Sequence, residues 1–80
     1  MWELDYTEEV KLYFLDNYPY TFDLLVKIEE LKFSPDAKPP EGCMHVPPNF
    51  YFWRVLDHLV IYRKLTESNT LEILVVKPAA

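Results

Sequence analysis

The chain has 80 residues, of which 50% are hydrophobic and 16% aromatic, and its formal net charge is −5. A chain of this length forms one domain around one core, and its apolar content excludes a disordered chain. No apolar run approaches the roughly 20 residues that span a bilayer. The opening MWELDYTEE is acidic where a signal peptide is basic. We therefore predict a single cytoplasmic domain, residues 1–80, that does not enter a membrane.

The acidic residues gather in the first half of the chain. Residues 1–41 carry ten acids and four bases, whereas residues 42–80 carry three acids and four bases. Nucleic-acid binders gain affinity from a basic face that releases counterions. A pI of about 4.8 therefore argues against tight nucleic-acid binding by the whole surface. It leaves room for a local basic patch in the second half.

Cysteine and histidine are too few for a redox or metal motif. Cys43 is the single cysteine, so an internal disulfide and a CxxC pair are excluded. We interpret it as a small, half-buried strand residue. His45 and His58 are the two histidines, and no spaced carboxylate cluster accompanies them. We expect no metal site and no cofactor.

The first elements are predicted to be a strand and a helix. Apolar and acidic residues alternate over residues 2–6, which is the period of a half-buried strand. Thr7 can cap a helix whose first turn holds Glu8 and Glu9, where the helix dipole favours acids. The residue before Pro19 avoids the α region, so this helix should end there. We expect Pro19 to lie in the first turn of the next helix.

The second helix is predicted to be amphipathic. Leu24, Leu25, Ile28 and Leu31 share one face, with charged residues on another. Because the connection to the first helix is so short, the two helices should form an antiparallel hairpin. Residues 34–41, SPDAKPPE, read as a loop that leads to a sheet.

The second half is predicted to be an antiparallel meander. Strands are expected around residues 50–55, 58–64 and 71–75, with turns at residues 56–57 and 67–69. Tyr51, Trp53 and Val55 should share one face of the first of these strands. Residues 42–46 suit an edge strand or an extended loop. The predicted class is α+β: an N-terminal strand, an antiparallel helical hairpin, then a three- to four-stranded antiparallel sheet.

The segment FYFWRVLDHLVIYRKL, with the opening WELDYTEEV and the proline-marked hairpin, resembles the RelE/ParE superfamily. These proteins are the bacterial toxins of type II toxin-antitoxin modules, and the resemblance covers nearly the whole chain. It implies a RelE/ParE-like fold, a role such as plasmid stabilisation, and an antitoxin-like protein partner. It also implies a target, either mRNA on the ribosome or gyrase.

The resemblance implies a degenerate catalytic set. Ribosome-dependent members cut mRNA by attack of a ribose 2′-OH on the adjacent phosphate, which needs cations and a proton-transfer group. Arg54 matches one basic position of this pattern, with His58 and Lys77 as further candidate catalytic residues. Phe52 and Leu59 stand where other basic side chains are expected. The ending VVKPAA has neither the arginine nor the aromatic or histidine tail of the pattern.

Each candidate also has a structural interpretation. Arg54 can extend its stem over neighbouring aromatics and leave its head in water, and His58 beside Asp57 can be a solvated turn residue instead of a general base. Tyr62 suits the core better than chemistry.

Four residues form the candidate RNA or partner surface, although neighbours on a strand face opposite sides. They are His45, Tyr62, Arg63 and Lys64.

Two hypotheses follow from the sequence. In the first, the chain is a toxin, either an mRNA endonuclease on the ribosome or a gyrase poison. In the second, it is a non-catalytic relative that keeps the fold and binds a protein partner, such as an antitoxin-like helix laid on the sheet and the helical hairpin. The missing cations and the acidic pI favour the second for mechanism, whereas the fold and the genomic habit of the family that the chain resembles favour the first.

Overall fold

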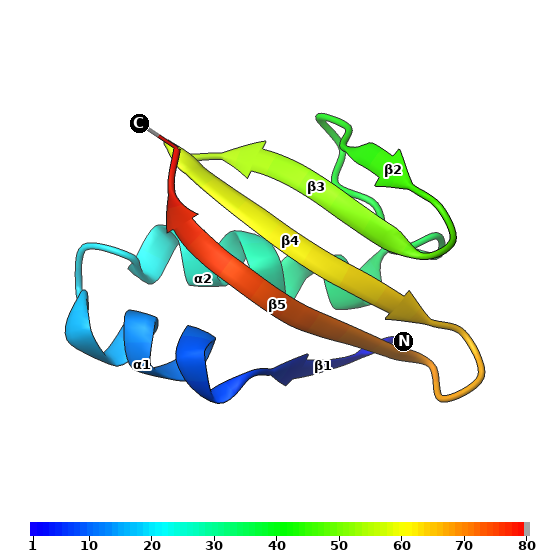
Figure 1. Ribbon diagram of the computed structural model, residues 1–80, viewed down its shortest axis with the longest axis horizontal. Coiled ribbons are helices and arrows are strands. Elements are labelled where there is room, and N and C mark those ends of the chain that lie inside the picture. Colours follow the sequence, from blue (N-terminus) through cyan, green and yellow to red (C-terminus); the bar gives the residue numbers. More distant parts are fainter. Residues whose placement is uncertain (80) are drawn as a thin grey trace.

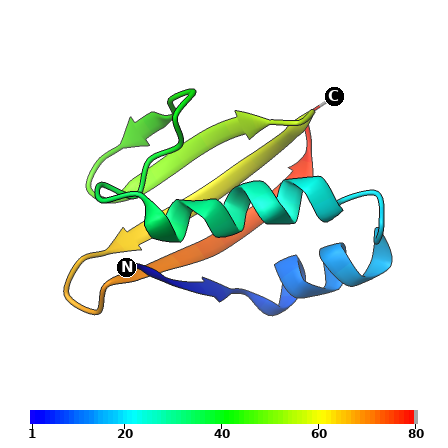
Figure 2. The same ribbon diagram turned by 180° about the vertical axis from the view of Figure 1, so that it is seen from behind.

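The computed structural model describes residues 1–79. A five-stranded sheet carries two helices on one face (Figures 1 and 2). The elements in chain order are β1 (Glu3–Tyr6), α1 (Glu8–Asp16), α2 (Phe22–Glu30), the 3-10 helix η1 (Leu31–Phe33), β2 (Met44–Val46), β3 (Phe50–Val55), β4 (His58–Leu65) and β5 (Thr70–Pro78). The α+β class, the N-terminal strand and the helical hairpin are confirmed.

The sheet has the strand order β1-β5-β4-β3-β2. Strands β2 to β5 form the predicted antiparallel part, and the segment around residues 42–46 is an edge strand. β1 adds a fifth strand, which pairs in parallel with β5 from Glu3 opposite Thr70 to Tyr6 opposite Ile73. The sheet is therefore mixed and larger than predicted, because an alternating pattern predicts a strand but not its neighbour in the sheet.

Local signals set most of the boundaries. The Thr7 side chain accepts a hydrogen bond from the Val10 backbone N–H at 3.3 Å and caps α1, as predicted. The prediction that Pro19 lies in the first turn of the second helix is wrong, because α2 begins only at Phe22. Pro19 lies in the turn between the helices, where its carbonyl accepts a hydrogen bond from the Phe22 N–H at 3.0 Å. This turn reverses the chain before α2 starts.

The β3–β4 turn is a two-residue loop, as predicted. Leu56 and Asp57 have φ angles of 49° and 58°. Positive φ at both central residues is the conformation that matches the twist of a tight hairpin. The loop therefore holds the paired ends of β3 and β4, Val55 and His58, opposite each other.

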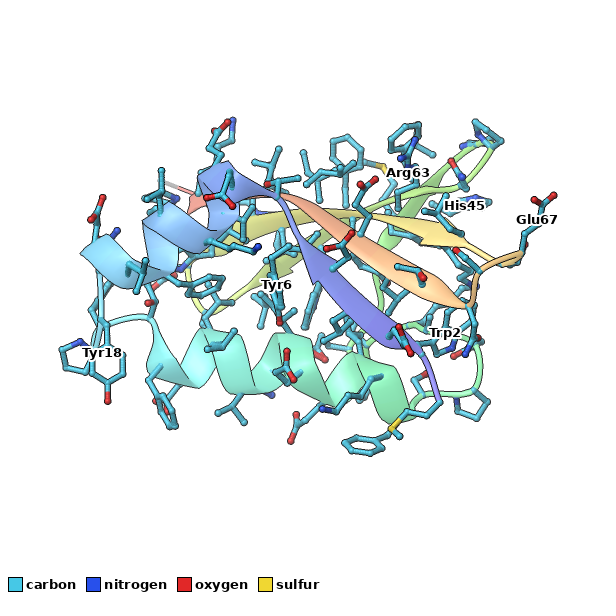
Figure 3. The ribbon with its side chains drawn as sticks, turned by 90° about the horizontal axis from the view of Figure 1, so that it is seen from below. Trp2, Tyr6, Tyr18, His45, Arg63 and Glu67 are labelled. Atoms are coloured by element: carbon cyan, nitrogen blue, oxygen red, sulfur yellow. The ribbon has the colours of Figure 1, made fainter. Side chains whose placement is uncertain are left out.

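The two faces of the sheet differ in their cover. The inner face points to the helices, and Figure 3 shows Tyr6 on this side and Arg63 pointing away from it. Cross-strand pairing places Tyr51, Trp53, Val55, Val60 and Tyr62 on the inner face, all of them buried. Leu24, Ile28 and Leu31 of the helical layer close the core from the other side. The outer face carries no other layer within residues 1–79 (Figure 1).

No helix among residues 1–79 is long and apolar enough to cross a bilayer.

Candidate functional site

Arg54 and Lys77 lie on the outer face at the end of the sheet that holds the β3–β4 turn. Arg54 of β3 is opposite Leu59 of β4, and Leu59 is opposite Lys77 of β5. Cross-strand partners point to the same face, so the three side chains form one row. We call Arg54, Leu59 and Lys77 the basic row. A shallow pocket of about 350 Å³ lies along it.

Among residues 1–79, the two cations of the basic row have no acidic partner. Arg54 and Lys77 are exposed, and neither forms an ion pair within residues 1–79. The Arg54 guanidinium donates a hydrogen bond to the Ala79 carbonyl at 3.3 Å. Phe52, two residues before Arg54, shares its face and is half-buried. The row can therefore attract an anion such as a phosphate.

His58 lies on the inner face, opposite to the basic row. Only 3% of its surface is exposed, so the interpretation as a solvated turn residue is wrong. It is buried because α1 and the turn between the helices cover this end of the sheet, where its ring contacts the rings of Tyr13 and Tyr20.

Its hydrogen bonds fix the tautomer of neutral His58. Nδ1 is 2.9 Å from the Leu56 carbonyl, which can only accept, so Nδ1 carries the proton. Nε2 then accepts from the Tyr13 hydroxyl at 2.7 Å. Both ring nitrogens are occupied within the fold.

Tyr13 is the partner that sequence reasoning missed. It lies on α1, 45 residues before His58. Burial raises the pKa of the Tyr13 hydroxyl, with the nearby Tyr20 as the second cause. No local signal in the sequence links the two residues, because their contact depends on how α1 docks on the sheet.

The structure brings together only two of the three candidate catalytic residues. Arg54 and Lys77 share the outer face, while His58 faces the helices. Phe52 and Leu59, which stand at positions where basic residues were expected, lie beside Arg54 on its own face. This end of the sheet thus offers cations to an anion but no histidine on the same face.

Tyr62 was predicted for the RNA or partner surface, and this placement is wrong. Its exposed fraction is 0%, and its hydroxyl donates a hydrogen bond to the Ala37 carbonyl at 2.8 Å. Burial, followed by the neighbouring Cys43 thiol, raises the pKa of Tyr62. Tyr62 is a core residue because β4 turns even-numbered side chains toward the helices. The alternative interpretation as core is confirmed.

Cys43 is half-buried and lies just before β2, so it is not a strand residue. Its Sγ is 3.8 Å from the Tyr62 hydroxyl.

The other three predicted surface residues do not form one patch. Arg63 lies on the outer face, where it forms an ion pair with Glu72 at 2.5 Å. Lys64 turns to the inner side, where its Nζ donates to the Asp36 carbonyl at 2.6 Å. The prediction that these neighbours face opposite sides is confirmed.

His45 lies on the edge strand β2. Its ring stacks on Tyr51 with 4.7 Å between centroids, and its Nε2 is 3.1 Å from the Pro48 carbonyl.

No group of three or more metal-ligating side chains is present within residues 1–79.

Comparisons with known proteins place the fold. No protein-family model matches the chain, and no curated protein matches its sequence. Among solved structures, the crystal structure of the isolated E. coli RelE toxin is similar, with a TM-score of 0.79 and 17% sequence identity. The match covers 100% of this chain and 86% of that one. The chain therefore has the fold of the RelE toxin.

Proposed function

We propose that the chain is a RelE-like component of a bacterial toxin-antitoxin module, and that it acts in the cytoplasm by binding a protein partner instead of cutting mRNA. The observation that carries this proposal is the burial of His58 on the face opposite to Arg54 and Lys77. Cleavage by a 2′-OH needs cations and a proton-transfer group at the same phosphate. In this chain the two cations and His58 lie on opposite faces of the sheet.

The helical hairpin offers the best surface for such a partner. Large apolar side chains are exposed along it, with 75% of Leu15 and 68% of Tyr18 accessible. Figure 3 shows Tyr18 projecting from the turn between the helices. An apolar groove of about 430 Å³ runs between α1 and α2. Contiguous exposed apolar surface of this kind is typical of a protein interface.

Charge favours a partner with basic flanks. Residues 1–41, which include the hairpin, carry ten acids and four bases. An amphipathic helix could lay its apolar side over Leu15 and Tyr18 and direct lysines or arginines toward these acids. We propose a helix of this type as the antitoxin-like partner.

Ribosome-dependent mRNA cleavage is the second candidate. It is supported by Arg54 and Lys77 of the basic row, which are exposed and form no ion pair within residues 1–79. A gyrase-directed toxin would also arrest growth, but it would act without shortening mRNA.

Expression of the chain alone in a bacterial host separates the two candidates. The first predicts normal growth, or an arrest that Arg54→Ala does not relieve. The second predicts an arrest that Arg54→Ala and Lys77→Ala relieve and that Lys11→Ala, which changes an exposed lysine of α1 outside the basic row, does not. A growth arrest that is relieved by the two basic-row variants and not by Lys11→Ala would overturn the first candidate.

Partner binding is tested with the product of a neighbouring short open reading frame. The purified pair should form a complex that weakens as salt is raised. Leu15→Lys, which changes a residue that lines the groove, should weaken binding about tenfold or more. The matched control Leu56→Lys changes an exposed leucine on the β3–β4 turn and should bind normally. Equal weakening by both variants would remove the hairpin as the interface.

A further inference from the structure

The sheet formed by residues 1–79 has one edge at which a further strand can pair. β1 pairs with β5 on one side, and no strand of residues 1–79 lies along its other side (Figure 1). The opposite edge of the sheet is β2, which has only three residues and ends next to Pro47 and Pro48. Proline has no backbone N–H, so β2 is a poor template for pairing. We call the unpaired side of β1 the open edge.

The backbone groups of two residues point to the open edge. The Glu3 N–H donates to the Asn69 carbonyl at 3.0 Å, on the β5 side. Successive residues of a strand direct their N–H and C=O groups to opposite sides, so those of Leu4 and Tyr6 point away from β5. Trp2, which also points this way, already donates to a carbonyl of η1 at 3.0 Å. Leu4 and Tyr6 have no partner strand within residues 1–79, and Figure 3 looks onto this edge with β1 in front of the other strands. An extended segment that lies along β1 can pair with these groups.

The outward side chains of β1 define the charge of that segment. Glu3 and Asp5 are exposed on the outer face, and neither forms an ion pair within residues 1–79. On the β5 side, Asp5 is opposite Glu72, which is already paired with Arg63. Opposite charges on neighbouring strands stabilise a sheet, and like charges destabilise it. A strand next to β1 is therefore favoured when it carries lysine or arginine on its outer face.

The inward side chains of β1 define the other face of the segment. Leu4 and Tyr6 are half-buried and belong to the rim of the core. Tyr6 also lines the apolar groove between α1 and α2. Apolar side chains of an added strand would cover both residues and extend the core. The segment should therefore alternate basic and apolar residues, with the period of a strand that is buried on one face.

A second copy of the chain is a poor occupant of the open edge. Two β1 strands paired with each other would bring Glu3 and Asp5 of both copies together. Like charges on paired strands are destabilising, and charged edge residues are a common device against edge-to-edge association. The open edge thus favours a foreign segment of opposite charge.

We propose that the open edge binds an extended basic segment of a partner protein, which becomes a sixth strand beside β1. Lysines or arginines at alternate positions face Glu3 and Asp5, and the apolar residues between them cover Leu4 and Tyr6. The backbone of the segment pairs with the N–H and C=O groups of Leu4 and Tyr6. The site differs from the basic row, which attracts anions, and its test depends neither on toxicity nor on a helix in the groove.

The test uses the ¹⁵N-labelled full chain and an acetylated, amidated seven-residue peptide in which lysine alternates with valine. Concentrations up to about 5 mM are needed, because a short flexible segment loses conformational entropy when it binds. The backbone N–H signals of Leu4 and Tyr6 should move downfield in a saturable manner as they gain acceptors. The Glu3 N–H, which already has an acceptor, should give a smaller shift. Unmoved Leu4 and Tyr6 signals would overturn the proposal.

Two control peptides test the pattern and the charge. A peptide of the same composition, with its lysines in one block and its valines in another, should bind about fivefold more weakly or worse, because its basic residues no longer share one face. A peptide with glutamate in place of lysine should not bind at this concentration. Equal binding of the block peptide would contradict a strand at the open edge.

N-methylation of the peptide tests the backbone pairing. A strand that is paired on one side presents only alternate N–H groups to its neighbour. Methylating the valine amides or the lysine amides therefore removes donors from one side at a time. One of the two methylated peptides should lose about tenfold in affinity, and the other should bind nearly normally. Equal affinities of the two would show that charge alone holds the peptide, and would overturn the proposal.

A charge reversal connects the response to β1. Asp5→Lys changes an exposed residue, should weaken binding of the lysine peptide about tenfold, and should allow the glutamate peptide to bind. The matched control Glu41→Lys makes the same change on the exposed loop before β2 and should bind the lysine peptide normally. Equal weakening by both variants would contradict a site at β1. Shifts of Leu4 and Tyr6 that grow with protein concentration in the absence of peptide would identify a second copy as the occupant and overturn the proposal.

Discussion

The two faces of the sheet are built from the same strands, but their polar groups differ in burial and in hydrogen bonding. On the inner face, His58 and Tyr62 are buried and each is hydrogen-bonded within the chain. On the outer face, Arg54 and Lys77 are exposed and have no acidic partner within residues 1–79. The polar groups of His58 and Tyr62 are thus satisfied within the chain, while the outer end is open to an external ligand. This difference indicates that His58 stabilises the fold, although its neighbour in the sequence, Leu59, belongs to the basic row on the other face.

The largest effect on the free energy of unfolding is expected when a buried isoleucine is replaced, and an isoleucine of the outer face serves as its comparison. Ile73 of β5 is 0% exposed on the inner face, and Ile61 of β4 is half-buried on the outer face. Ile73→Ala should lower the free energy of unfolding by about 2–5 kcal/mol, because it leaves a cavity in a packed core. Ile61→Ala should cost about 1 kcal/mol, since water already reaches this site. Urea unfolding of both variants measures the contrast, and equal losses would contradict a one-sided core.

The next effect is a loss of stability in alkaline solution. Burial, with the hydrogen bond to Glu29 second, raises the pKa of Tyr6, and burial raises that of Tyr62. A raised pKa in the fold means that the stability is complete below the unfolded value of about 10. Above it, stability should fall by about 1.4 kcal/mol per pH unit for the buried Tyr62 and by less for the half-buried Tyr6, where solvent screens the effect. Urea titrations between pH 8 and pH 11 should show a plateau and then a decline. If the stability of Tyr62→Phe fell with pH as steeply as that of the unchanged chain, Tyr62 would not contribute to the decline.

A smaller effect is expected from the Tyr62 hydroxyl itself. Tyr62→Phe keeps the ring but leaves the carbonyl of the buried Ala37 without its partner. The free energy of unfolding at neutral pH should fall by about 1–2 kcal/mol. Tyr18→Phe removes an exposed hydroxyl and should change it by less than about 0.5 kcal/mol. Indistinguishable urea midpoints for the two variants would show that the Tyr62 bond adds no net stability.

Most of the fold was predicted from the alternation of apolar and polar residues along the strands. The faces of β3 and β4 followed from residue parity, and the turns at residues 56–57 and 67–69 lie where the sequence placed them. The parallel pairing of β1 with β5 could not be predicted, because it joins segments about 67 residues apart in the chain. The start of α2 was missed because proline is equally compatible with the turn before a helix and with its first turn.

The candidate site was harder to predict than the fold. Arg54 and Lys77 could be chosen as exposed cations, but their alignment on either side of Leu59 needs the register of three strands. Parity already placed His58 on the face opposite to Leu59. Its burial and its bond to Tyr13 depend on the docking of α1. The buried Trp53 Nε1–H has no hydrogen-bond acceptor within residues 1–79. No sequence signal marks it, since every buried tryptophan looks alike until its neighbours are known.

Programmed ribosomes provide the most direct test of the central claim that the chain keeps the RelE fold but acts by binding. Purified chain is added to ribosomes translating a defined mRNA, and the mRNA 5′ ends are mapped by primer extension. We predict no new ends, and the same pattern for Arg54→Ala. New ends that appear only with translating ribosomes and vanish with Arg54→Ala or Lys77→Ala would contradict the account.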